Sequence, residues 1–135
     1  MTQSANPKTT PPDLTSEEIQ LPAVIARNER TARRGFWQKM ARVAGRIPFA
    51  EEAASAYYAA IDPKTPTRVR ATLLAALAYF VLPADLIPDI VTGLGFTDDA
   101  TVLMTAIGIV SGHIKEDHKA KARAALHIVD TPTDR

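Results

Sequence analysis

The feature that most constrains this chain is a central block, residues 71–114, that contains neither lysine nor arginine. Two strongly apolar segments, residues 71–82 and 100–112, flank a short polar connection within this block. Four aspartates lie at the connection: Asp85, Asp89, Asp98 and Asp99. Carboxylates in apolar surroundings are costly unless they are hydrogen-bonded, paired or bound to a cation, so these aspartates need a structural or functional reason.

The periodicity of the chain predicts an all-α fold, a small helical bundle built around this apolar hairpin. No alternation of polar and apolar residues persists along the sequence, which argues against β-strands. In the second apolar segment a stripe follows the helical spacing of i, i+4, i+7 and i+11: Leu103, Ile107, Val110 and Ile114. Pro83 and Pro88 bracket the connection, because proline ends or kinks a helix. We expect the first arm to end near Leu82, and the second to begin near Thr97 and to continue past Ile114 into charged turns.

Further helices are predicted ahead of the hairpin. Thr15 with Glu18 resembles a capping box at the first of them, and Pro22 interrupts or restarts it before a basic helix that runs to about Gly45. Another helix is expected over residues 49–61. The sequence thus predicts one helical domain over residues 14–129, with the hairpin at 67–114. Residues 1–13 are expected to be a disordered tail and residues 130–135 a frayed end, since both are poor in side chains that could be buried.

The basic residues gather on both sides of the apolar block. Between Arg27 and Arg46 the chain has seven basic residues and a single acid, Glu29. We interpret this stretch as an amphipathic helix suited to an anionic membrane surface, with arginines at the headgroups and aromatic rings at the acyl boundary. The candidate contacts are Arg30, Arg33, Arg34, Phe36 and Trp37. Solvated helix faces are the plainer alternative, and a nucleic acid is not expected because no readable nucleic-acid motif is present.

The residues around the connection form a motif. Tyr79, Pro83, Asp85, Leu86, Ile87, Pro88 and Asp89 are followed by Gly95, Asp98 and Asp99. This pattern resembles the signature of the YkvA-like bacterial domain of unknown function, over roughly residues 67–114. The resemblance implies a compact helical hairpin, often in proteins that associate with membranes, and it implies no established activity. The chain departs from it at Thr92, where members commonly have a proline ahead of Gly93.

Three explanations of the aspartates stay open. As helix caps, Asp85 would serve a short turn and Asp98 or Asp99 the following helix, while Asp89 would pair with an arginine from elsewhere. As a cation site, the four carboxylates would offer oxygen ligands to Mg²⁺ or Ca²⁺. As the tip of a membrane-dipping hairpin, they would mark the turn between two lipid-facing segments.

The lengths of the two apolar segments limit the membrane explanation. Residues 71–82 and 100–112 would form helices of about 18 Å and about 20 Å, whereas the hydrocarbon core is about 30 Å thick. Neither segment spans alone, so a shallow hairpin completed by a homo-oligomer or a membrane protein is the form that stays open. The N-terminus has no basic region followed by an apolar run. We therefore expect a protein that is not secreted and lies on the cytoplasmic side, free or membrane-associated.

No catalytic residue is predicted, because no cysteine is present and nothing near the aspartates supplies a nucleophile or a phosphate-binding loop. The preferred interpretation is a non-enzymatic membrane-associated or interaction module without a cofactor. The alternative is a soluble domain that binds a divalent cation, Mg²⁺ or Ca²⁺, through the four aspartates, with hydrolytic activity as an extension. The three histidines, His113, His118 and His127, are expected at the surface.

Overall fold

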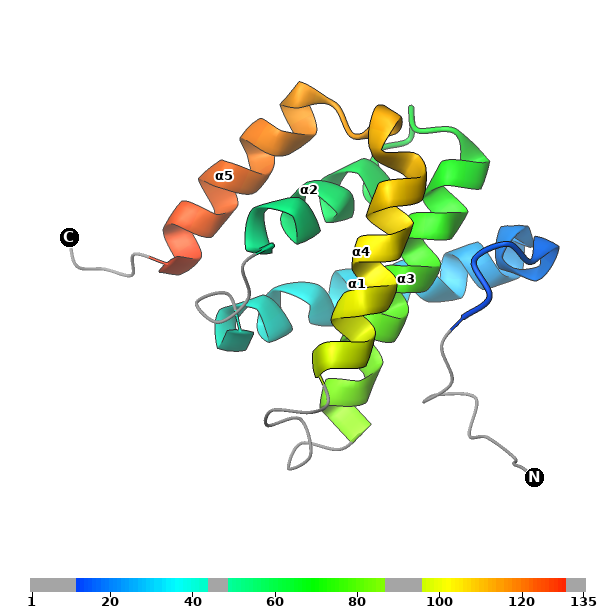
Figure 1. The fold of residues 1–135 in the computed structure, drawn as a ribbon, viewed down its shortest axis with the longest axis horizontal. Helices are drawn as coiled ribbons and strands as arrows, with labels where there is room; N and C mark the ends of the chain where they lie inside the picture. Colours follow the sequence, from blue (N-terminus) through cyan, green and yellow to red (C-terminus); the bar gives the residue numbers. More distant parts are fainter. Residues whose placement is uncertain (1–11, 44–48, 87–95, 131–135) are drawn as a thin grey trace.

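The computed structural model shows a bundle of α-helices (Figure 1). It describes residues 12–43, 49–86 and 96–130, and the side chains of residues 43, 82–86, 96–99 and 128–130 fall outside the description. Within the described ranges there is no strand, so the predicted all-α bundle is confirmed. Most of the two predicted tails lies outside these ranges.

The elements follow one another along the chain as η1 (Glu17–Gln20), α1 (Pro22–Val43), α2 (Ala50–Ile61), α3 (Thr67–Leu86), α4 (Phe96–Val110), η3 (Ser111–His113) and α5 (Glu116–Asp130). Ser16, rather than Thr15, caps η1, because its hydroxyl accepts the backbone N–H of Glu18 at 2.9 Å. Asp13 accepts the backbone N–H of Thr15 at 3.0 Å and its hydroxyl at 2.6 Å. The ordered turn therefore begins inside the segment predicted as a tail, and at the other end α5 includes Asp130.

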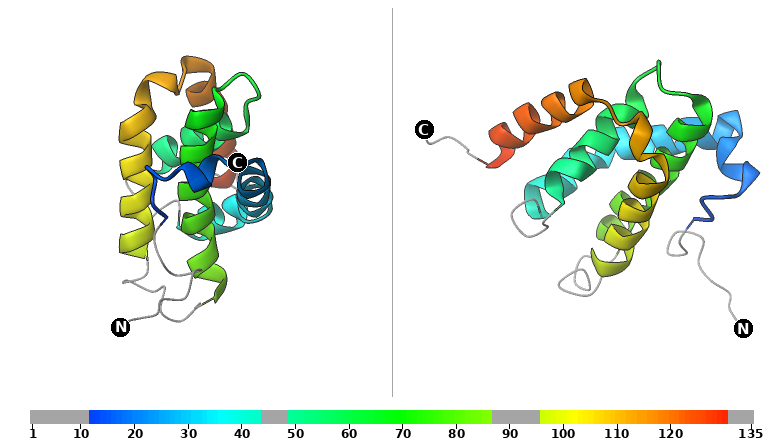
Figure 2. Two further views of the ribbon diagram at one scale, coloured as in Figure 1. Left: turned by 90° about the vertical axis from the view of Figure 1, so that its right-hand side faces the viewer. Right: turned by 45° about the horizontal axis from the view of Figure 1, so that its top comes forward.

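Helix α3 is the centre of the bundle. All side chains from Ala71 to Val81 are buried. Helices α1, α2 and α4 and the short η1 pack around α3, with α1 and α4 on opposite sides of it in the left view of Figure 2. A helix that is apolar all round lies either inside a protein or in lipid, and here protein covers it. Among the described helices, none combines the length and the apolar character needed to cross a membrane.

An aromatic cluster joins α1 to α2 and α3. The ring of Phe36 stacks on that of Tyr57, with centroids 4.7 Å apart and planes 7° from parallel, and lies 6.2 Å from the ring of Phe80. Gly35 lets α1 cross α3 closely, since a Cβ at this position would overlap the side chain of Val81. Burial of aromatic rings with such packing is a main source of stability in a small bundle.

Two predicted helix ends are wrong. Helix α3 continues through Pro83 to Leu86, because a proline in the last turn removes one hydrogen bond of the ladder without preventing helical backbone angles. The second arm does not run on past Ile114: α4 ends at Val110, the η3 turn follows, and the charged residues form a separate helix, α5. Helix α5 turns away and packs mainly on α2.

Candidate functional site

The acidic connection of the hairpin begins at the end of α3 and finishes at the start of α4. Asp85 belongs to the last turn of α3, and Asp98 and Asp99 belong to the first turn of α4, at the same end of the antiparallel pair (Figure 1). The side chains of these three aspartates fall outside the description, and so does Asp89 as a whole. The caps and the cation site predicted for the four aspartates therefore stay predictions.

The other residues of the motif divide in the same way. Tyr79 is buried in α3, and Pro83 and Leu86 belong to the last two turns of that helix. Ile87, Pro88 and Gly95 lie outside the described residues. The structure thus confirms the helical hairpin on either side of the motif.

A buried cation lies close to this acidic end. Lys39 of α1 is only 2% exposed, and its ammonium donates a hydrogen bond to the carbonyl oxygen of Phe80. The same ammonium lies 4.1 Å from the centroid of the Phe80 ring. Asp85 follows Phe80 by about 7.5 Å along the helix axis. An ammonium inside a protein is costly unless its charge is compensated, and the carbonyl oxygen and the ring of Phe80 both compensate that of Lys39.

Lys39 is a residue that the sequence interpretation missed. Lys39 is one of the seven basic residues between Arg27 and Arg46, for which solvated helix faces are the plainer alternative, and for Lys39 that alternative is wrong. The signal was its register: Ala32, Phe36 and Met40 line the buried side of α1, and Lys39 follows Phe36 by three residues on that same side.

The arginines of α1 do face solvent. Arg27, Arg30, Arg33, Arg34 and Arg42 are all exposed. Of these, Arg33 is bound to the only acid of the helix, with its Nε 2.8 Å from an oxygen of Glu29. The other oxygen of Glu29 accepts a hydrogen bond from Arg70 of α3 at 3.1 Å. Within the ranges that the structure describes, Arg27, Arg30, Arg34 and Arg42 have no carboxylate partner.

The aromatic half of the predicted membrane contact is not at the surface. Phe36 has no exposed area, because the apolar side of α1 is turned to α2 and α3. The prediction that Phe36 contacts a membrane is therefore wrong. Trp37 is partly buried and packs edge-on against Phe36 and Tyr57, with ring centroids 4.9 Å and 5.6 Å away. The surface of α1 that a partner could contact therefore consists mainly of arginine side chains.

A second polar cluster joins the end of α2 to the start of α5. The Nε2 atom of His118 lies 2.8 Å from a carboxylate oxygen of Asp62, and the backbone N–H of Lys115 donates to its Nδ1 atom at 2.9 Å. Because Nδ1 accepts, the proton of the neutral ring is on Nε2 and is donated to Asp62. His118 thus does what Glu or Gln does in a capping box, and it ties α5 to α2. This hydrogen bond, with a further one from the backbone N–H of Lys64, holds the pKa of Asp62 below its usual value.

The residue types of this cluster would suit a metal site, but the hydrogen bonds of His118 would not. Ligand atoms of Asp62, Asp117 and His118 lie within 4.8 Å of one another. A metal on Nε2 would move the ring proton to Nδ1, where the N–H of Lys115 already points. We therefore interpret the cluster as a structural anchor. His118 is only 1% exposed, so the prediction of a surface histidine is wrong; its spacing of four from Ile114 and from Ala122 was the missed signal.

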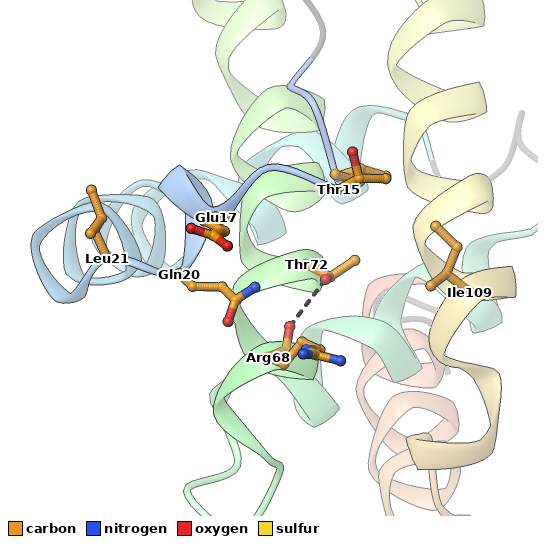
Figure 3. Close-up of a pocket in the computed structure, with 8 residues that line it drawn as sticks. Thr15, Glu17, Gln20, Leu21, Arg68, Thr72 and Ile109 are labelled. Carbon is orange, nitrogen blue, oxygen red and sulfur yellow. Dashed lines mark hydrogen bonds between the residues drawn. The ribbon is translucent and has the colours of Figure 1, made fainter.

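A pocket of about 600 Å³ opens between the η1 segment, α3 and α4 (Figure 3). Leu14, Thr15, Glu17, Gln20, Leu21, Arg68, Thr72 and Ile109 line it. The hydroxyl of Thr72 donates to the carbonyl oxygen of Arg68 at 3.0 Å, within the turn of α3. The lining holds one cation and one carboxylate, and it has no histidine or cysteine to act as base or nucleophile.

Comparison with known proteins agrees with the resemblance seen in the motif. Residues 69–105 match the family described as "Protein of unknown function (DUF1232)". The chain is 49% identical over 41 residues to "Uncharacterized membrane protein YkvA" of Bacillus subtilis (strain 168), a match that covers 30% of this chain and 39% of that protein. No solved structure matches the chain. The hairpin segment is therefore similar to a YkvA-like domain of unknown function, and the chain spans about two fifths of the length of the curated relative.

Proposed function

We propose that this protein is a non-enzymatic module that attaches to an anionic membrane surface through the arginine face of α1, formed by Arg27, Arg30, Arg34 and Arg42. The observation that carries the proposal is that these four guanidinium groups are exposed and have no carboxylate partner within the described ranges. Their spacing places them on one side of α1, opposite its buried side, over about 22 Å of helix.

The strength and character of the attachment follow from the structure. Basic residues near an anionic bilayer are attracted by about 1 kcal/mol each, and the attraction is screened by salt. Because Phe36 is buried, the arginine face has little apolar surface to insert into lipid. We therefore expect electrostatic, reversible binding. That a relative of the hairpin segment is named a membrane protein supports the proposal.

The test is sedimentation of the protein with vesicles of phosphatidylcholine, with and without phosphatidylglycerol. We expect binding to the anionic vesicles alone, lost on raising the salt concentration and strongly reduced in the variant Arg27→Gln, Arg30→Gln, Arg34→Gln. The matched control removes three charges elsewhere, with Lys64→Gln, Lys119→Gln, Lys121→Gln, and should bind almost as well as the wild type.

Three results would contradict this function. Equal binding to neutral and anionic vesicles would remove its electrostatic basis. A control variant that loses as much binding as the arginine variant would show that net charge, and not the arginine face, is responsible. Salt-sensitive binding to an oligonucleotide without any binding to vesicles would assign the arginine face to nucleic acid instead.

The alternative is a divalent cation held by Asp85, Asp89, Asp98 and Asp99, because carboxylate oxygens are the ligands that Mg²⁺ and Ca²⁺ take. If the alternative holds, Mg²⁺ or Ca²⁺ raises the melting temperature of the wild type and not that of the variant Asp85→Ala, Asp89→Ala.

A further inference from the structure

One side of α4 is uncovered and has no charge. Thr101, Met104, Thr105, Gly108 and Ile109, with Gly112 just beyond the helix, are exposed, and we call them the outer face of α4. Ile109 is 60% exposed and Met104 37%; with Leu21 they are the large apolar side chains that the described residues leave at the surface. No charged residue occurs from Ala100 to Gly112. Such a surface is unusual for a helix that only faces water.

The two glycines of this face have no role in the packing of a single chain. A Cβ atom at Gly108 or at Gly112 would have nothing within 4 Å. Glycine is less favourable than alanine inside a helix, so Gly108 weakens α4 without an internal reason. Glycines spaced by four residues allow a second helix to approach closely.

Two other occupants of the outer face fit poorly. Residues 1–11 of the chain have Met1 and Ala5 as apolar residues other than proline, too few to cover it. A membrane bound by the arginine face of α1 lies on the far side of α3 from α4, as the left view of Figure 2 shows. The occupant must therefore be uncharged, able to approach closely, and present on the side away from that membrane.

We propose that the outer face of α4 binds the same face of a second copy of the chain in an antiparallel pair. With the twofold axis between Ala106 and Ile107, Thr105 of one copy lies level with Gly108 of the other at the centre of the contact. Met104 and Ile109 lie on opposite edges of the outer face, so the two copies of Met104 meet along one edge and the two copies of Ile109 along the other. The surface is self-complementary, as a twofold contact requires.

The charges at the two ends of α4 select the antiparallel direction. The first turn of the helix contains Asp98 and Asp99, and the turn after its end contains His113 and Lys115. An antiparallel pair brings the acidic first turn of each copy to the end of the other helix that is followed by Lys115. A parallel pair would bring the two acidic turns together, where like charges repel.

The first test is sedimentation velocity of the full chain over a range of concentrations, without lipid. We expect a dimer for the wild type and a monomer for both Gly108→Leu and Ile109→Glu. Ala120→Leu and Ala124→Glu make the same two kinds of change at exposed sites of α5 and should remain dimeric. Because space is open at Gly108, the fold of the monomer should tolerate leucine there, and an unchanged helical spectrum checks this. A wild type that stays monomeric at every concentration would overturn the proposal, and so would variants that dimerise normally.

The second test reads the direction of the pair. The chain has no cysteine, so single cysteines can be introduced and joined by a short bifunctional thiol reagent. In the antiparallel pair two copies of Thr105→Cys are close to the twofold axis and should be joined, whereas two copies of Gly112→Cys lie beyond opposite ends of the paired helices, more than about 10 Å apart. Joining of both variants with equal yield would mean a parallel pair and overturn the proposed geometry. Neither test depends on vesicle binding, so failure of the pair and failure of the membrane function are distinguishable.

Discussion

Helices α3 and α4 are the two arms of one apolar hairpin, yet the fold covers them very differently. Protein surrounds α3 along its whole stretch from Ala71 to Val81, whereas α4 is packed on one side and leaves Ile109 60% exposed on the other. The difference lies in the neighbours, since η1, α1, α2 and α4 all contact α3, while α5 passes α4 by and packs on α2. The apolar character of a helix therefore indicates that it has partners, and the other helices decide on how many sides.

The sharpest comparison is a truncation in each arm. Leu77→Ala in α3 removes a fully buried side chain and should lower the free energy of unfolding by about 2–5 kcal/mol. Ile109→Ala in α4 should change it by less than about 0.5 kcal/mol when the protein is dilute enough to be monomeric. Urea denaturation of both variants measures the two values. If the two variants lost similar amounts of unfolding free energy, the outer side of α4 would be covered in solution. The proposed difference in cover between α3 and α4 would then be wrong.

Glycine-to-alanine changes should have opposite effects on stability at Gly35, which lies at a helix contact, and at Gly108, which does not. Gly35→Ala places a methyl group against Val81 where α1 crosses α3, and overpacking of this kind costs about 1–3 kcal/mol. In protein dilute enough to be monomeric, Gly108→Ala meets nothing within 4 Å and should stabilise the helix by up to about 1 kcal/mol through propensity alone. The melting temperature should thus fall for the first variant and rise for the second. A rise for both would mean that α1 and α3 are not in close contact at Gly35.

The smallest effect concerns the anchor that keeps α5 on α2 and away from α4. The hydrogen bond from His118 lowers the pKa of Asp62, so the anchor contributes its full stability above the ordinary carboxyl pKa of about 3.9 and loses it as the pH falls through the lower folded-state value. Asp62→Asn can still accept the N–H of Lys64, but it then turns an amide donor toward the N–H of His118. The variant should be less stable than the wild type at pH 7, and this gap should close toward pH 3.

Denaturation curves of the two proteins across this pH range test the anchor. A gap that stays constant from neutral to acidic pH would show that the charge of Asp62 does not matter. A gap that closes while α5 remains attached at low pH would show that apolar packing alone, through Ala122 and Leu126, holds this helix.

Local pattern was sufficient for the parts of this fold that depend on one helix at a time. The stripe of Leu103, Ile107 and Val110 predicts the buried side of α4, and that side is buried in the structure. The hairpin and its antiparallel arms also follow from the sequence, as does the inability of either arm to span a bilayer.

Apart from the end of α3, the failures concern how the helices are arranged relative to one another. Residue type predicts Lys39 and His118 at the surface, although their positions are on buried sides of α1 and α5. The split between α4 and α5 at Ser111–His113 was missed because Ile114 continues the apolar stripe by coincidence of spacing, from the far side of a turn. The spacing of apolar residues along a single helix does not show where a turn interrupts that helix.

The tautomer of His118 has a consequence for the alignment of α5. One nitrogen must meet an N–H donor and the other must meet a carboxylate, so the ring fits in one orientation only. If α5 slid along α2 by one residue, the ring would lose both partners while buried, at a place where unpaired polar atoms are costly. Apolar contacts of Ala122 and Leu126 are not directional and would tolerate several alignments. The single histidine thereby selects one alignment from many that hydrophobic packing alone would allow.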